Sequence, residues 1–322
     1  MRIVVVPSSG FGNRIRMMAS CKILADLLGT DLGVIWTPTV DCQLLFEDVF
    51  ATDNTFKKVT IEDVNTKKYY FRGHVHTNEI LPVITQVLND YEILLLEGGH
   101  EFKVPSMNIE EFINRKQDFY QSLRFTNEIM NHVTTYLSRL GDNYIAVHYR
   151  DVIQKYDASD IANSAPNTIS PVSFNQNSPI VSFYSVLNQV SDTVPILVVS
   201  NNQMVLPYIK GRLPSKQLFK TDYNVTSRSD RREMILSVVE FILLSRAKCI
   251  IGSYYSSFSD EASFYNQIPK IIPVTERLDR ELTEKMGYHC YGFGVIKNQN
   301  NLYGLNLHNI SQIQDLFTNT KS

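Results

Sequence analysis

The sequence contains no run of the roughly 20 apolar residues that a membrane-spanning helix needs, so it predicts no membrane span. Its charges nearly balance, with 31 Lys and Arg against 33 Asp and Glu, and this gives no indication of a nucleic-acid partner. The apolar stretch at residues 1–6 runs directly into a polar glycine loop, which favours a first strand over a signal peptide. We expect a cytoplasmic protein, or the soluble catalytic part of a longer or secretory-pathway protein.

Motifs for metals and common cofactors are also missing. The four cysteines have no CxxC spacing, which favours buried thiols over a metal site or a disulfide framework. No Asp-x-Asp pair occurs, and the seven histidines lack the spacing of a metal-binding motif. A GxxxxGK[ST] phosphate loop is absent as well. The sequence therefore predicts no metal and no cofactor.

What the sequence does contain is an alternation of apolar strands and amphipathic helices, in 322 residues that suffice for two domains. Strands are expected at 2–6, 32–36, 69–75, 92–98, 143–150, 195–201, 217–222 and 248–253, and helices at 15–27, 80–91, 108–123, 127–140, 180–190, 202–213 and 231–247. We expect Gly29 to end the first helix. This pattern predicts the α/β class, with domains at 1–140 and 141–322.

The first candidate site is the loop after the first strand. Gly10 and Gly12 allow a close backbone approach to a ligand, and Asn13 and Arg14 add side-chain donors at a helix N-terminus. A dinucleotide-binding loop would have a third glycine where Ile15 stands, which disfavours an NAD-dependent oxidoreductase. Taken alone, the loop is equally compatible with a simple strand-to-helix turn.

Two stretches of the second domain point to an anion. His148 and Arg150 lie two residues apart at a strand end, where an arginine can offer several donors to a diphosphate. Serines follow a later buried strand, at Ser253, Ser256, Ser257 and Ser259, and their hydroxyl and N–H groups can form an anion site. The alternatives are a surface ion pair of Arg150 with Asp151 or Asp157, and serines that act only as helix caps.

Three stretches together resemble the GT-B-fold fucosyltransferases, the superfamily of the protein O-fucosyltransferases, the α1,6-fucosyltransferases and the nodulation fucosyltransferases. These are "GFGNRIRMMASCKILADLLG" at the start, "VHYR" in the middle and "VVEFILLSRAKCIIGSYYSSFSDEA" near the end. The order of the three stretches also agrees with that superfamily. The resemblance implies two Rossmann-like domains that face a central cleft, with the acceptor side in the first domain and the nucleotide sugar in the second.

The resemblance also implies roles for individual residues. Arg150 and Asn13 match residues beside the sugar diphosphate, and with Asp157 they form the expected catalytic set. The expected donor-binding residues are Gly10, Gly12, Arg14, His148, Arg231, Glu240, Ser256, Ser257, Phe258 and Ser259. Asp151 stands where many relatives carry a second basic residue, so the acceptor and the sugar can differ from those of known members.

The implied reaction is the inverting, metal-independent transfer of L-fucose from GDP-fucose to a hydroxyl of a glycan or protein. Asp151, Asp157 and Asp160 all follow the strand that carries His148, and each is a candidate base. The polar tract at 156–179 is a candidate acceptor-side lid, or an insertion without a catalytic role. Two alternatives stay open: another nucleotide-activated sugar such as rhamnose, and a non-catalytic protein that binds nucleotide sugars or glycans.

Overall fold

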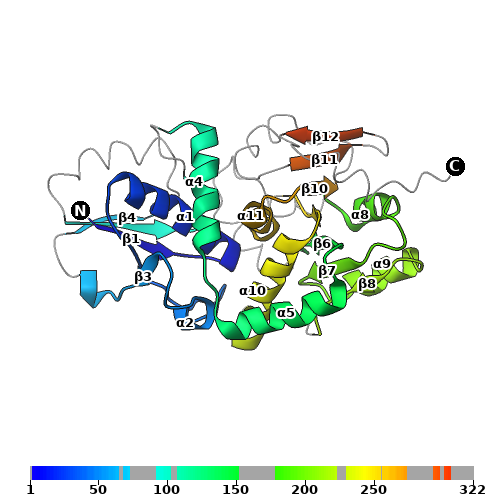
Figure 1. The fold of residues 1–322 in the computed structure, drawn as a ribbon, viewed down its shortest axis with the longest axis horizontal. Coiled ribbons are helices and arrows are strands. Elements are labelled where there is room, and N and C mark those ends of the chain that lie inside the picture. Colours follow the sequence, from blue (N-terminus) through cyan, green and yellow to red (C-terminus); the bar gives the residue numbers. More distant parts are fainter. Residues whose placement is uncertain are drawn as a thin grey trace, which may run out of the picture. The chain divides into compact units, whose positions relative to one another are not determined.

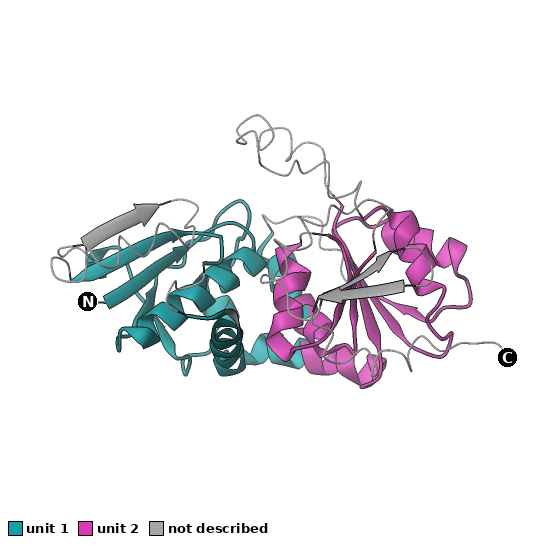
Figure 2. Cartoon of the chain, turned by 90° about the horizontal axis from the view of Figure 1, so that it is seen from above, with its two compact units in different colours: residues 1–132, 227–239 teal, residues 133–226, 240–322 magenta. Residues whose placement is uncertain are grey.

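The structure is a computed structural model, and it describes residues 2–64, 68–72, 92–102, 107–151, 178–222, 230–254, 256–273, 293–297 and 301–305. The chain divides into two compact units, one of residues 1–132 and 227–239 and the other of residues 133–226 and 240–322 (Figure 2). Unit 1 is therefore built from two separate parts of the chain. The predicted domain boundary after residue 140 stays a prediction.

Unit 1 is built on a parallel sheet in the order β3-β2-β1-β5-β4, of which β1, β3 and β4 are labelled in Figure 1. Its strands are β1 (Arg2–Pro7), β2 (Leu32–Val34), β3 (Phe56–Lys58), β4 (Lys68–Arg72) and β5 (Ile93–Gly98). Parallel strands that are covered on both faces become continuous apolar runs, which explains the sequences of β1 and β5. The predicted strands at 2–6 and 92–98 are confirmed, and β2 ends at Val34, two residues before the predicted end. β4 confirms the described part of the predicted strand at 69–75, whose residues 73–75 lie outside the described residues.

The helices of unit 1 are α1 (Phe11–Leu27), the one-turn α2 (Phe46–Val49), the 3-10 turn η1 (Glu62–Val64) and α4 (Ile109–Ser122). Helices α1 and α4 lie where the sequence predicts them, whereas α2 and η1 are not predicted. Helix α1 packs on the sheet against β1. It ends as predicted, because Gly29 adopts a left-handed φ of 61° just after the helix. The predicted helix at 80–91 lies outside the described residues.

Unit 2 is built on a larger sheet in the order β12-β11-β10-β9-β6-β7-β8, parallel except for the β11–β12 pair. Its strands are β6 (Ile145–Tyr149), β7 (Ile196–Ser200), β8 (Leu218–Phe219), β9 (Ile250–Gly252), β10 (Lys270–Pro273), β11 (Phe293–Lys297) and β12 (Asn301–Leu305). The strands β6 to β9 are predicted by the sequence, whereas β10 to β12 are not.

Helices α8 (Ile180–Leu187), α9 (Val205–Arg212) and α11 (Ser257–Asn266) belong to unit 2. Helices α5 (Asn127–Leu140) and α10 (Arg231–Arg246) each begin in unit 1 and end in unit 2. Apolar side chains of β6, β7, β9, β10, α8 and α9 form the buried core of unit 2. The α/β class is confirmed, and the arrangement of two sheets about a cleft stays a prediction.

Two expectations about the whole chain concern membranes and cysteines. Among the described residues, no helix combines the length and the apolar character that a bilayer crossing requires. Cys21, Cys42 and Cys249 are buried thiols outside any disulfide, as the spacing predicts, and Cys290 lies outside the described residues.

Candidate functional site

The candidate site of unit 2 lies at the carboxyl ends of its parallel strands, where open α/β sheets bind their ligands. Strand β6 ends in His148 and Tyr149, and Arg150 follows it directly. The neighbouring strand β9 ends at Gly252 and leads through Ser253 to α11. Because β6 and β9 pair, the sheet brings His148 and Arg150 together with the serine loop, which contains Ser253, Ser256, Ser257 and Ser259.

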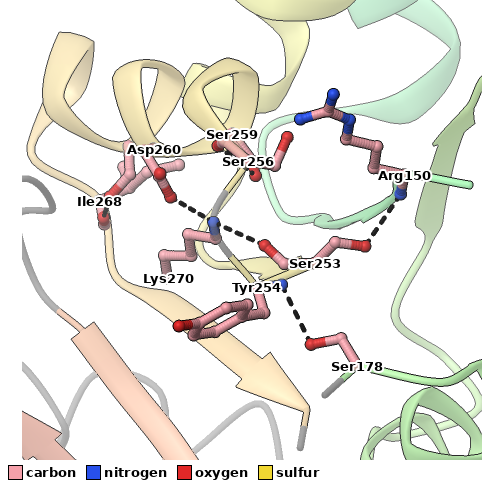
Figure 3. Close-up of polar contacts among 10 residues, drawn as sticks. Arg150, Ser178, Ser253, Tyr254, Ser256, Ser259, Asp260, Ile268 and Lys270 are labelled. Carbon is pink, nitrogen blue, oxygen red and sulfur yellow. Dashed lines mark hydrogen bonds and ion pairs between the residues drawn. The ribbon is translucent and has the colours of Figure 1, made fainter. Parts of the chain in front are cut away.

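Ser253 is 2% exposed and forms three hydrogen bonds, two of which join the ends of β6 and β9. Its N–H donates to the carbonyl of His148 at 2.9 Å, and its Oγ accepts from the backbone N–H of Arg150 at 2.9 Å. Its carbonyl accepts from Lys270 Nζ at 3.1 Å. Figure 3 shows the contacts of Ser253 with Arg150 and Lys270, with the Arg150 side chain extending in this view toward the start of α11.

Helix α11 begins at the serine loop, with Ser256 as its N-cap. The Ser256 side chain forms no capping hydrogen bond, although a serine in this position normally caps one of the first N–H groups. Ser256 and Ser259 are buried, whereas Ser257 and Phe258 are partly exposed. A helix N-terminus without a side-chain cap is suited to an anion, because its N–H groups and the helix dipole both favour negative charge.

His148 is the second unusual group beside this helix start. Its side chain is 7% exposed, and its ring lies 5.3 Å from the ring of Phe258 in the first turn of α11. Its Nδ1 forms no hydrogen bond to any described residue. Burial, together with the charges of Lys270 and Arg150, lowers the pKa of His148 to about 3. The imidazole is therefore neutral at pH 7 and keeps an unused hydrogen-bonding atom, which native proteins rarely leave in their interior.

Polar contacts continue along the sheet edge toward β7. The side chain of Asn201 pairs with the backbone of Asp151, accepting from its N–H at 2.8 Å and donating to its carbonyl at 2.7 Å. Asn202 Nδ2 donates to Asp151 Oδ2 at 2.5 Å. Asp151, one of the three candidate bases, is thus held in place by the loop that follows β7. Asp157 and Asp160 lie outside the described residues, as does most of the tract at 156–179.

Glu240 lies farther along the same edge, in α10. It is 6% exposed and accepts a hydrogen bond from Thr221 Oγ1 at 2.6 Å. Burial raises the pKa of Glu240 to about 7, although the Thr221 hydrogen bond acts in the opposite direction. Both residues line a small pocket of about 30 Å³, together with Val198, Ser200, Asn202, Gln203, Leu206 and Lys220. Such a volume holds one or two waters, or a small polar group of a larger ligand.

In unit 1, the loop after β1 places Gly10, Gly12 and Asn13 at the start of α1. Gly10 is the N-cap of α1 and offers no side chain to its first N–H groups. Asn13 Oδ1 is a buried atom with no hydrogen bond within the described part of the chain. The loop thus has an uncapped helix start and one buried polar atom without a partner, as the candidate site of unit 2 does.

Arg14, in contrast, has its guanidinium engaged inside unit 1. The side chain is 0% exposed, and its guanidinium carbon lies 4.7 Å from the ring centroid of the buried Trp36. It donates to the carbonyls of Ser9 and Thr37 at 2.9 and 2.8 Å, and to Thr39 Oγ1 at 2.9 Å. The observed contacts of Arg14 hold the loops after β1 and β2 to each other, and its predicted donor contact stays a prediction.

Arg231 also has a partner within unit 1. It forms two hydrogen bonds to the carboxylate of Asp48, from Nε at 2.8 Å and from Nη2 at 2.5 Å. The Arg231 side chain is 57% exposed, whereas that of Asp48 is 4% exposed. This interaction holds the pKa of Asp48 below its ordinary value. The role of Arg231 in donor binding stays a prediction.

Sequence reasoning missed two charged residues behind the serine loop. Lys270, the first residue of β10, forms an ion pair with Asp260 in the first turn of α11. The two side chains are 0% and 6% exposed. A lysine at the head of the apolar run "KIIP" was the available signal, since a lysine is almost never buried without a partner. Among the described residues, no group of three or more His, Cys, Asp and Glu is arranged to hold a metal ion.

No family model matches this sequence, and no curated protein is similar to it in sequence. Solved structures do match. A structure of the NodZ alpha-1,6-fucosyltransferase soaked with GDP-fucose has a TM-score of 0.57 at 14% identity, over 94% of this chain and 98% of that one. A mutant of Arabidopsis thaliana FUT1 in complex with GDP has a TM-score of 0.55 at 15% identity, over 84% of this chain and 70% of that one. POFUT1 in complex with GDP has a TM-score of 0.51 at 14% identity, over 83% and 94%.

This chain shares the fold of these fucosyltransferases. The resemblance noted in three short stretches of the sequence thus extends to the structure, over 83% of the chain or more in each comparison. At 14 to 15% identity, the likeness concerns the fold, and the chemistry has to be argued from the residues of the candidate site itself.

Proposed function

We propose that this protein is an inverting, metal-independent glycosyltransferase that moves L-fucose from GDP-fucose to a hydroxyl of a glycan or protein. One observation carries the proposal: the sheet of unit 2 brings Arg150, the neutral His148 and the uncapped start of α11 to one edge. The fold supports it, since similar structures hold GDP or GDP-fucose.

The proposed diphosphate site uses two features of unit 2. The N–H groups at the start of α11, between Ser256 and Ser259, receive the phosphate oxygens, and Arg150 adds a full positive charge. His148 contributes its unused Nδ1 to the nucleotide side of the site. Glu240 and the pocket beside Thr221 hold a polar group of the nucleoside. The donor is thereby bound through its leaving group, which is the part that gains negative charge during transfer.

The proposed reaction is a single displacement at the anomeric carbon of the sugar. The acceptor oxygen forms a bond to this carbon while the bond to the β-phosphate oxygen breaks, and GDP leaves with the electron pair. The acceptor proton passes to a carboxylate, for which Asp151, Asp157 and Asp160 are the candidates. In the GT-B arrangement that we propose, unit 1 supplies the acceptor side, with Asn13 next to the sugar diphosphate.

A thermal-shift titration with GDP, UDP, ADP and NAD tests the proposal. A ligand that binds only the folded state at about 100 times its Kd stabilises that state by about 2.7 kcal/mol. We expect an increase in Tm with GDP and none with ADP or NAD. A response to NAD alone, or no response to GDP, would overturn the proposal. A donor screen that detects the released nucleotide by mass then identifies the sugar.

A further inference from the structure

The buried ion pair of Lys270 and Asp260 lies directly behind the proposed diphosphate site. Its side chains are 0% and 6% exposed, so neither can contact a bound substrate. Removing two charges from water costs several kcal/mol for each ion, and apolar residues of similar volume are often at least as stabilising. The contribution of this pair to stability is therefore a weak explanation for its presence, and its contacts suggest a different one.

Each member of the pair holds one end of the serine loop. Lys270 Nζ donates to the carbonyl of Ser253 at 3.1 Å, where the loop begins, and it pairs with the carboxylate of Asp260 in the first turn of α11, where the loop ends. The N–H and the Oγ of Ser253 are occupied by the backbone of β6 and Arg150. Lys270 thus completes the set of contacts that fixes Ser253 (Figure 3).

Gly252 shows that the lysine passes very close to the strand end. A Cβ atom at this position would lie 2.6 Å from Cε of Lys270 and 3.0 Å from Oγ of Ser259. Real Cβ atoms essentially never make contacts below 3.0 Å, so only glycine leaves room for the lysine stem. The glycine of "IIGS", Gly252, therefore stands at the point where the Lys270 side chain from β10 crosses β9.

The pair also determines the net charge beside the start of α11, where the phosphates of the donor would bind. An unpaired carboxylate in the first turn of α11 would repel a phosphate at that helix start, although it would suit the helix dipole in the absence of a ligand. The ammonium of Lys270 compensates the charge of Asp260 within the protein interior. It also contributes to the low pKa of His148, which keeps the imidazole neutral at the same edge.

We propose that the Lys270–Asp260 ion pair is a positioning device for the proposed diphosphate site, fixing Ser253 and the start of α11 in the geometry that receives the phosphates. This inference rests on the proposed function, and it adds two residues that act through the serine loop rather than on the substrate. Lys270 and Asp260 are accordingly positioning residues.

The test removes both charges together, in the double variant Asp260→Asn/Lys270→Met. A single change would leave one buried charge without its partner and strongly destabilise the fold, which the double change avoids. We expect the Kd for GDP, measured by isothermal titration calorimetry, to rise at least tenfold. Gly252→Ala is the second variant, since it displaces Lys270 without altering any charge, and we expect a change in the same direction.

Unit 1 offers a matched control. Lys116 and Glu101 form a second buried ion pair, with both side chains 0% exposed. The double variant Glu101→Gln/Lys116→Met removes the same kind of interaction from the other unit. We expect its Kd for GDP to stay within twofold of the wild-type value. An equal loss of affinity in both double variants would show a general effect on the fold and would overturn the inference.

Repeating the titration with GMP and guanosine distinguishes a change in the position of the serine loop from a general loss of stability. If the serine loop no longer lies in the position that receives the phosphates, the affinity for GDP falls most, that for GMP less and that for guanosine least. General destabilisation lowers the affinity for all three ligands alike. Equal weakening along this series, or unchanged GDP affinity in both Asp260→Asn/Lys270→Met and Gly252→Ala, would overturn the inference and leave the proposed function intact. If the wild-type protein itself bound no GDP, the proposed function would fail and the inference with it.

Discussion

Arg14 in unit 1 and Arg150 in unit 2 both lie at the carboxyl edge of a parallel sheet. Arg14 is 0% exposed, and its guanidinium donates to two carbonyls and a hydroxyl of its own unit. Arg150 is partly exposed, and its backbone is fixed by Ser253. The comparison teaches that a basic residue near a strand end is a candidate ligand only after its contacts within the protein are known, because the two arginines look alike in the sequence.

The largest effect expected from this comparison is on the rate of transfer. Arg150→Ala removes a preorganised positive charge from the leaving group, which typically lowers a rate by about 10²–10³. We expect this loss in the release of GDP from GDP-fucose, with a Tm close to that of the wild-type protein. Near-normal turnover in the variant would remove Arg150 from the mechanism.

Arg14→Ala should produce the opposite pattern. The change deletes three charge-assisted hydrogen bonds, leaves the carbonyls of Ser9 and Thr37 without this donor, and opens a cavity beside Trp36. We expect the free energy of unfolding to fall by about 4 kcal/mol in urea denaturation. Unchanged stability combined with weaker GDP binding would instead assign Arg14 to the donor site.

A smaller effect is expected at Glu240, and it depends on pH. The pKa of this carboxyl is about 7 in the folded protein, above the ordinary value of 4.5 that it has in the unfolded chain. Between these values the folded state keeps a proton that the unfolded state releases, so stability falls as pH rises through this window. Glu240→Gln removes this titration.

We therefore expect the free energy of unfolding of Glu240→Gln to increase by about 2 kcal/mol relative to that of the wild-type protein as pH rises from 5 to 8, as measured by chemical denaturation. Thr221→Val removes the hydrogen bond that lowers the pKa of Glu240, and it should move the window to higher pH. A constant difference between Glu240→Gln and wild type at every pH would contradict the raised pKa. The pH dependence of stability has the opposite sign at His148, because the pKa of this residue is lowered to about 3. Its contribution to stability is therefore lost as pH falls from about 6.5 toward 3.

The sequence predicts much of the fold, because buried parallel strands and amphipathic helices have distinct periods. It identifies β1, β2, β4 and β5 in unit 1, β6 to β9 in unit 2, and the helices α1, α4, α5, α8, α9 and α10, whereas it misses the short strand β3. It does not identify β10, whose first residue is a lysine, since a buried charge interrupts the apolar pattern until its partner is known. Residues beyond β10 carry no strong period, and β11 and β12 are also missed.

The candidate site is predicted less completely. Short motifs locate His148, Arg150 and the serine loop, because these residues lie next to strand ends that the sequence reveals. The burial of Arg14, the pairing of Arg231 with Asp48 and the ion pair behind the serine loop depend on contacts between segments far apart in the chain. Such contacts leave no periodic signal in a single sequence.

The division of unit 1 into two stretches of chain has a consequence for synthesis on the ribosome. Residues 1–132 emerge first, yet residues 227–239, with the Arg231 that pairs with the buried Asp48, emerge only after β6, β7 and β8 of the second sheet have been translated. A domain normally folds as a unit once its sequence is available. Completion of the N-terminal half is thereby tied to translation of the C-terminal half, and a gene cut after residue 140 would encode a first fragment that lacks one of its own helical segments.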